Sequence, residues 1–232
     1  QYGLVTGDGI RRIDLKSLNN VRIKNERLLC FYNSIIYNGK VLSNDTYKDE
    51  SKVKYYDVNE LIAAKEGEAP AVTELDIIQK QKINFVLAKD GNVYTLESAD
   101  NGCNIVKIKN DFTLEKVFAN FQPAKGPYHS SPTIGMVASE TENIIYLVST
   151  DGAIYKYILG DSDSLKAPFI AAESGVSITA PLQLNQQSGE LYVTYTEERK
   201  DESKIVVYSK DGKVLHTVDC GESVPSQILF NN

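Results

Sequence analysis

Short runs rich in Val, Ile, Tyr, Phe and Thr recur along the whole chain, bounded by Gly, Asp, Asn or Pro. Such runs, with polar turn residues between them, are typical of β-strands joined by hairpins. Residues 58–71 are the main departure, since they read as a short helix or a decorated outer loop ended by Gly67 and Pro70. The pattern predicts a nearly all-β chain.

The same pattern of strands repeats about five times along the chain, and the clearest repeat is the last, residues 188–232. The interval from Tyr2 to Tyr192, divided over four repeats, is 47.5 residues per repeat, a length typical of propeller blades. Counted outward from the blade centre, the first strands are expected at 29–36, 82–88, 133–138, 181–185 and 226–230.

The second and third strands of each repeat follow from the same kind of run. We expect the second strands at 2–6, 40–44, 92–97, 144–149 and 190–196, and the third strands at 10–15, 52–57, 105–109, 153–159 and 204–209. Asp90-Gly91, Asp151-Gly152 and Asp211-Gly212 each lie between two strands, where glycine tolerates the positive φ of a tight turn.

The two ends of the chain are out of phase with each other. The chain begins on a second strand and ends on a first strand, so we expect residues 226–230 to pair with residues 2–6. That pairing would remove sheet edges, which otherwise template aggregation. The prediction is therefore an all-β fold, a single β-propeller domain over residues 1–232, with five blades of four antiparallel strands closed by the N- and C-terminal strands.

The final repeat contains a recognisable motif: Leu191, Tyr192, Val193 and Thr194, then Ile205 to Tyr208, then Gly212, Lys213 and Val214, and finally Gly221 with Pro225. It resembles the YVTN-type (quinoprotein-like) β-propeller repeat of bacterial surface and periplasmic proteins, with Tyr195 in place of the Asn. The motif is structural and carries no catalytic residue. The resemblance implies an exported propeller with a binding or assembly role, in the periplasm or at the outer membrane or cell surface.

Proteins of that type are often lipoproteins, but no lipid-attachment cysteine is visible, so we expect any lipid anchor to lie outside this sequence. The chain opens at Gln1 inside strand-like sequence, without Met, a basic segment or an apolar leader. An exported precursor whose leader has been removed has this pattern, and so does a shortened chain.

Composition excludes several classes of protein. With 232 residues, 42% hydrophobic and 24% charged, the chain can bury a substantial core. A net charge of −6 argues against nucleic acid as a partner, and no apolar run approaches the length of a transmembrane helix. Cys30, Cys103 and Cys220 have no zinc-site spacing, which leaves ordinary small residues or one disulfide with a free thiol. We expect a monomer without cofactor or metal.

In a propeller, the loops from each outermost strand to the next innermost strand share one face with the hairpins between second and third strands. We call this the loop face, and it is the default ligand site. The candidate ligand-binding residues there are Arg27, Gln81, Tyr128, His129, Thr179 and Ser226. They suit a small polar ligand, such as a glycan, or a protein partner, and they equally suit a hydrated rim.

No catalytic residue is predicted. The expected innermost strands contain no Asp or Glu, which argues against a glycosidase built on paired carboxylates. The leading interpretation is a non-enzymatic binding protein. The alternatives are a pure protein-interaction scaffold and a hydrolase or lyase with its active site at the channel mouth. Cys103, which follows Asn101-Gly102 in a hairpin, is expected to be accessible.

Overall fold

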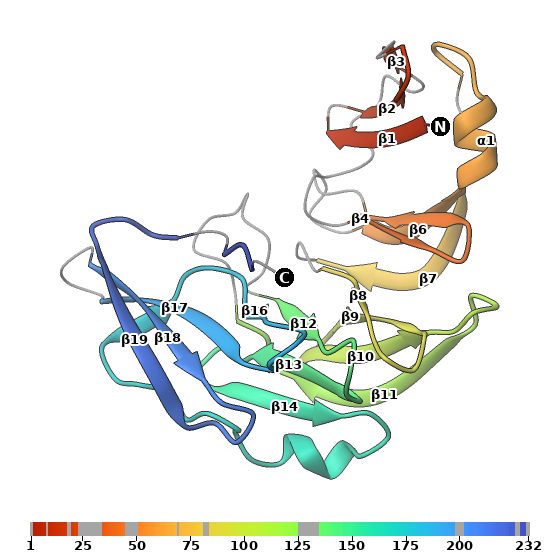
Figure 1. The fold of residues 1–232 in the computed structure, drawn as a ribbon. Coiled ribbons are helices and arrows are strands. Elements are labelled where there is room, and N and C mark those ends of the chain that lie inside the picture. The colour runs from red at the N-terminus through yellow and green to blue at the C-terminus, as the bar shows by residue number, and fades with distance from the viewer. Residues whose placement is uncertain are drawn as a thin grey trace.

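The structure is a computed structural model. It describes residues 2–7, 9–17, 20–22, 34–44, 51–68, 70–80, 84–124, 135–197, 202–225 and 228–230, with the backbone alone for 2–13, 20–22 and 51. Within these residues the strands form five antiparallel sheets that follow one another along an arc (Figure 1). The predicted all-β architecture with a repeating antiparallel sheet is confirmed.

Each sheet is built from consecutive strands. The first has the order β1 (Tyr2–Gly7), β2 (Gly9–Asp14) and β3 (Asn20–Arg22). The second contains β4 (Ser34–Tyr37), β5 (Lys40–Ser43), β6 (Ser51–Asp57) and β7 (Thr73–Gln79). The third contains β8 (Val86–Leu87), β9 (Val93–Ala99), β10 (Gly102–Ile108) and β11 (Leu114–Phe121).

The last two sheets depart from four regular strands. The fourth consists of β12 (Met136–Ala138), β13 (Ile144–Val148) and β14 (Ile154–Ile158), followed by the 3-10 turn η1 (Ser162–Leu165). In the fifth, β15 (Val176–Ile178) and β16 (Gln183–Leu184) both pair with β17 (Leu191–Glu197), and β18 (Ser203–Tyr208) and β19 (Val214–Gly221) follow outward.

The expected second and third strands agree with β1, β5, β9, β13 and β17 and with β2, β6, β10, β14 and β18. The segment expected as a short helix or a decorated outer loop contains the helix α1 (Val58–Ala63), which joins β6 to β7 and ends before Gly67 and Pro70. Asp57 caps its start, because its carboxylate accepts the amide hydrogens of Asn59 at 2.8 Å and Glu60 at 3.1 Å. Leu61 on this helix is fully buried.

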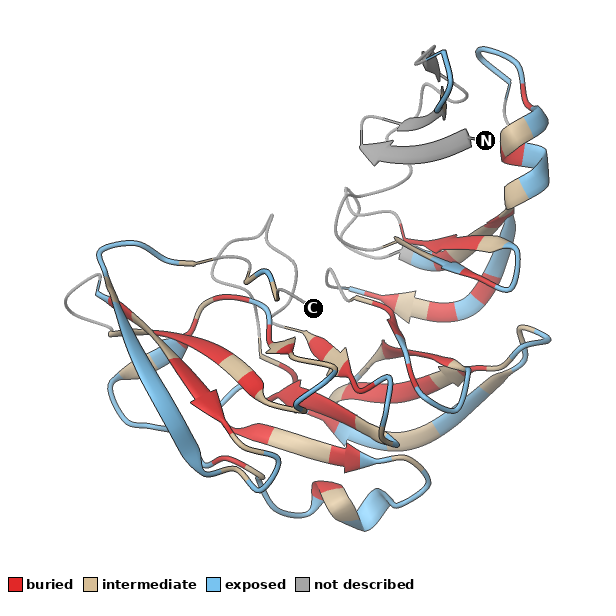
Figure 2. Cartoon of the chain, viewed as in Figure 1, coloured by how far each residue is buried: buried red, intermediate tan, exposed pale blue. Residues whose placement is uncertain are grey.

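The core lies between neighbouring sheets, as face-to-face stacking of blades requires. One cluster joins the third and fourth sheets, with Ile105 and Phe121 packed toward Met136 and Leu147. Equivalent clusters join the second to the third sheet and the fourth to the fifth. Figure 2 shows buried residues along the central strands and an exposed outermost strand β19. The second to fifth sheets therefore depend on their neighbours for burial.

The described residues do not show the predicted closure of the ring. Residues 228–230 form no strand, and they lie against the fifth sheet. The backbone amide of Ile228 donates to Gln183 Oε1 at 2.7 Å, and the Phe230 ring packs edge-on against Tyr192 at 5.0 Å. Phe230 is thus half-buried against the fifth sheet. In Figure 1 the first and fifth sheets stand at opposite ends of the arc.

The expectation that Cys103 is accessible is wrong. Its side chain is 3% exposed and packs among the residues between the third and fourth sheets. Cys103 lies inside β10, opposite Ser98 and Phe121, so it points into the sheet stack although the hairpin tip beside it is exposed. Burial raises the pKa of its thiol to about 11, with a further contribution from the charge of Glu97.

Candidate functional site

Five of the six predicted ligand-binding residues lie outside the described residues: Arg27, Gln81, Tyr128, His129 and Ser226. The sixth, Thr179, is half-buried in the interruption between β15 and β16. Its backbone amide donates to Thr194 O at 3.2 Å, and its hydroxyl lies 2.7 Å from Thr196 Oγ1. Thr179 thus supports the innermost strand of the fifth sheet.

A groove of about 290 Å³ opens between the third and fourth sheets. It is lined by Phe118, Asn120, Phe121, Gln122, Ser149, Thr150, Asp151, Tyr155 and Leu165. Gln122 begins the connection from β11 to the fourth sheet, and Asp151 lies in the hairpin between β13 and β14. The groove therefore lies on the loop face, at the beginning of the segment that contains Tyr128 and His129.

The groove exists because the fourth sheet has no regular outermost strand in the described residues. Beyond β14, the chain returns to that strand through two isolated antiparallel bridges, Ile158 with Asp161 and Ile154 with Ile170, and not through a continuous ladder. Leu165 of η1 reaches inward to fill part of the space, and it is 6% exposed. Strand β11, the outermost strand of the third sheet, consequently has no regular outermost strand of the fourth sheet to pack against.

A bulge in β11 shapes one side of the groove. The pairing steps from Cys103 opposite Phe121 to Ile105 opposite Phe118, so β11 has one more residue than β10 in this interval. Asn120 takes up the extra residue with φ at 62°, a left-handed conformation that asparagine tolerates better than most residues. The exposed Asn120 side chain lines the groove as a result.

Aromatic rings make up much of the wall. The Phe121 and Tyr155 rings meet edge to face, with centroids 5.8 Å apart. Phe121 is buried at 6% exposure, whereas Phe118 and Tyr155 are half-buried and so reach the open space. The wall offers a rigid apolar surface to a ligand.

Polar groups form the rim. The Ser149 hydroxyl and the Ala153 amide both donate to Asp151 Oδ1, the latter at 3.1 Å, and these two bonds lower the pKa of Asp151. The Thr150 amide donates to Gln122 O at 2.9 Å, which ties the hairpin to the connection leaving β11. Apolar walls with a few fixed polar groups are typical of small-molecule sites.

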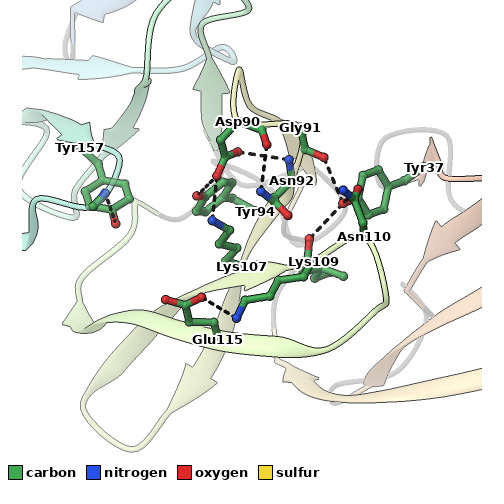
Figure 3. Close-up of polar contacts among 12 residues, drawn as sticks. Tyr37, Asp90, Gly91, Asn92, Tyr94, Lys107, Lys109, Asn110, Glu115 and Tyr157 are labelled. Atoms are coloured by element: carbon green, nitrogen blue, oxygen red, sulfur yellow. Dashed lines mark hydrogen bonds and ion pairs between the residues drawn. The ribbon is translucent and has the colours of Figure 1, made fainter.

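A second polar cluster joins the second and third sheets at the opposite face (Figure 3). Asp90 accepts from Lys107 Nζ at 2.8 Å and from the Tyr94 hydroxyl at 2.9 Å. The Tyr37 hydroxyl of β4 reaches across to donate to Asn110 Oδ1 at 2.7 Å. These groups use one another as partners, so the cluster fastens two sheets together.

The lowered pKa of Asp90 reflects several opposing influences. Partial burial favours its neutral form, but the Lys107 ammonium, the Tyr94 hydroxyl and the Asn92 amide together outweigh that effect. Burial and the neighbouring carboxylate raise the pKa of Tyr94, which stays neutral. Asp90 is therefore an ionised structural anchor.

The sequence interpretation missed the groove residues on β11 and β14. Phe118, Phe121 and Tyr155 read as ordinary strand aromatics, and Asp151 was recognised only as part of a turn. The local sequence carries no signal that these strands face each other across a gap. Among the residues that the structure describes, no three His, Cys, Asp or Glu side chains gather as a metal site would require. No helix in this part of the chain is long and apolar enough to cross a membrane.

Comparison with solved structures gives the class of fold. The chain matches a puromycin hydrolase with a TM-score of 0.58 and 14% identity, over 96% of this chain and 35% of that one. It matches prolyl oligopeptidase B from Galerina marginata, bound to a substrate, with a TM-score of 0.58 and 12% identity, over 94% and 32%. The chain thus spans about a third of these enzymes, and the likeness shows a β-propeller-like fold alone.

A virginiamycin B lyase from Staphylococcus aureus also matches, with a TM-score of 0.45 and 13% identity, over 91% of this chain and 62% of the lyase. The model of the DUF5074 family, a domain of unknown function, matches residues 2–231, so the chain belongs to that family. No curated protein matches the chain in sequence.

Proposed function

We propose that this protein is a non-enzymatic binding propeller that holds a small polar ligand, such as a glycan, in the groove between the third and fourth sheets. The observation that supports this is the lining itself, in which half-buried Phe118 and Tyr155 stand beside the polar groups of Asn120, Gln122 and Asp151. Sugars present apolar ring faces and hydroxyl edges, and this wall and rim match both.

The position of the groove supports the proposal as well. It lies on the loop face, where the connection from β11 leaves toward residues 125–134 and therefore toward Tyr128 and His129. Both side chains lie outside the described residues, and we propose them as ligand-binding residues from the sequence alone.

The test is binding of neutral oligosaccharides by calorimetry to the intact chain. Replacing both Phe118 and Tyr155 by Ala should weaken binding about 30-fold. Each ring contributes about 1 kcal/mol to the binding free energy, and about 2 kcal/mol corresponds to that change in Kd. Thr150→Gln should also weaken binding, because it fills the groove from the exposed rim and leaves both rings in place. Thr217→Gln, on the exposed strand β19, is the matched control and should bind normally.

Two results would count against the proposal. If no oligosaccharide binds, the interaction-scaffold alternative becomes the better interpretation. If a ligand binds and its affinity survives both groove variants, the groove is not its site. In that second case, variants of Arg27, Tyr128 and His129 would show whether the originally predicted residues hold the ligand elsewhere on the loop face.

We also propose that the five sheets are blades of a YVTN-type propeller that acts outside the cytoplasm as a monomer. The motif of the final repeat supports the repeat type, and the export of such proteins supports the location. Fractionation of cells that express the full-length gene tests the location. Recovery of the protein in the cytoplasmic fraction would contradict it.

A further inference from the structure

The charge of the groove is carried by one residue. Of the nine residues that line it, Asp151 alone is ionisable at neutral pH, and the others are aromatic, aliphatic, amide or hydroxyl side chains. No Lys or Arg is among them. The only charged side chain that a ligand in the groove would contact is therefore one carboxylate.

That carboxylate keeps one oxygen for a ligand. Ser149 and Ala153 both donate to Asp151 Oδ1. No ion pair in the described part of the chain includes Asp151, and its Oδ2 has no partner there. Asp90 in the comparable turn between β8 and β9 is different, because Lys107 and Tyr94 both occupy its Oδ2.

The aromatic wall favours the same sign of charge. The face of an aromatic ring attracts a cation through its quadrupole. The rings of Tyr94, Tyr195 and Phe169 each have a lysine ammonium of the protein within 6 Å of the centroid. Among the described contacts Tyr155 has no such lysine, and its one ring–ring contact is with Phe121. Its open side thus offers a cation a second attraction.

The whole chain adds to this preference. Its net charge of −6 produces a field that concentrates cations near the surface and repels anions. The field, the lone carboxylate and the aromatic wall all favour a cationic ligand.

We infer that the groove selects ligands that carry an ammonium group on a sugar-like ring, with the ammonium at Asp151 Oδ2 and the ring against Phe118 and Tyr155. This inference rests on the proposed function and names its ligand class, an amino sugar or a similar organic cation. A carboxylated ligand of the same size is disfavoured, because it would place like charges together.

Three tetrasaccharides of matched size test the inference. They are glucosamine tetramer, which is cationic, N-acetylglucosamine tetramer, which is neutral, and galacturonic acid tetramer, which is anionic. Calorimetry at low salt should show the cationic tetramer binding roughly fivefold or more tighter than the neutral one, the scale of an exposed ion pair with a cation–ring contact. The anionic tetramer should bind most weakly. Raising the salt should shrink the preference.

Asp151→Asn is the decisive variant, since it keeps the shape and the Oδ1 acceptor but removes the charge. It should bring the ratio of the cationic to the neutral tetramer's affinity, measured on the same variant, down to about one. Asp211→Asn is the matched control, because Asp211-Gly212 is also an Asp-Gly turn between two strands, β18 and β19, and lies outside the groove.

The outcomes separate the two proposals. If the neutral and cationic tetramers bind equally, or if Asp151→Asn keeps the preference, the inference is overturned while ligand binding stands. If none of the tetramers binds, both proposals fail. If Asp151→Asn does not fold, the salt dependence of the wild-type preference decides, and a preference that is unchanged at high salt overturns the inference.

Discussion

Gly135 should be the glycine at which an added methyl group most directly breaks a contact between sheets. A Cβ at this position would lie 2.5 Å from Asn84 Oδ1. Asn84 joins the third and fourth sheets, since it donates to Met136 O at 2.7 Å and accepts from the Met136 amide at 3.1 Å. The methyl group of Gly135→Ala would therefore displace the side chain that holds both bonds.

The size of the effect follows from those two bonds. Each contributes about 1 kcal/mol, and the lower entropy of the unfolded alanine chain offsets about 0.5 kcal/mol. The net loss of about 1.5 kcal/mol should lower the melting temperature of a chain of this length by about 3 to 6 °C. Thermal unfolding followed by circular dichroism measures this directly.

A double-mutant cycle isolates the cause. Asn84→Ala loses the same two bonds without crowding, so Gly135→Ala added to it should cost almost nothing further. The reasoning is refuted if Gly135→Ala melts like the wild type. It is equally refuted if the two losses add in the double variant, because the methyl group would then act on something other than Asn84.

Two further predictions concern ionisable groups. Because the folded pKa of Asp90 is lowered, its ionised form adds stability above the unfolded value near 4 that is lost as the pH falls through the folded value. Asp90→Asn should thus be less stable than the wild type by about 2 kcal/mol at pH 7, and the difference should shrink in urea titrations as the pH falls below about 4. Cys103, buried and with a raised pKa, should react with a thiol reagent much more slowly than the half-buried Cys220 of β19. Labelling in the reverse order would contradict the placement of Cys103.

The second and third strands could be predicted because their signals are local. Runs rich in β-branched and aromatic residues, bounded by polar turn residues, define β17 and β18 without knowledge of any other repeat. The positive φ of Gly91, Gly152 and Gly212 agrees with the turns expected there. Hairpin neighbours are also adjacent in sequence, so their pairing needs no long-range information.

The innermost strands were harder to place because they are short and pair on one side. Within the described part of the expected strand at 82–88, only Val86–Leu87 is strand, and of the one at 181–185 only Gln183–Leu184. Side chains rather than a ladder join neighbouring innermost strands, as Asn84 and Gln186 do when they bond the backbone of the fourth sheet. A propensity pattern cannot report such contacts.

The sequence by itself determined the repeat, the strand type and most hairpins, because strand-forming runs and the turn residues between them act over a few residues. Only the tertiary structure decided the groove. Phe118 and Tyr155 are 37 positions apart, and they line one space because the third sheet stacks on a fourth sheet that lacks a regular outer strand. Only that stacking makes a turn aspartate and two strand aromatics one candidate binding surface.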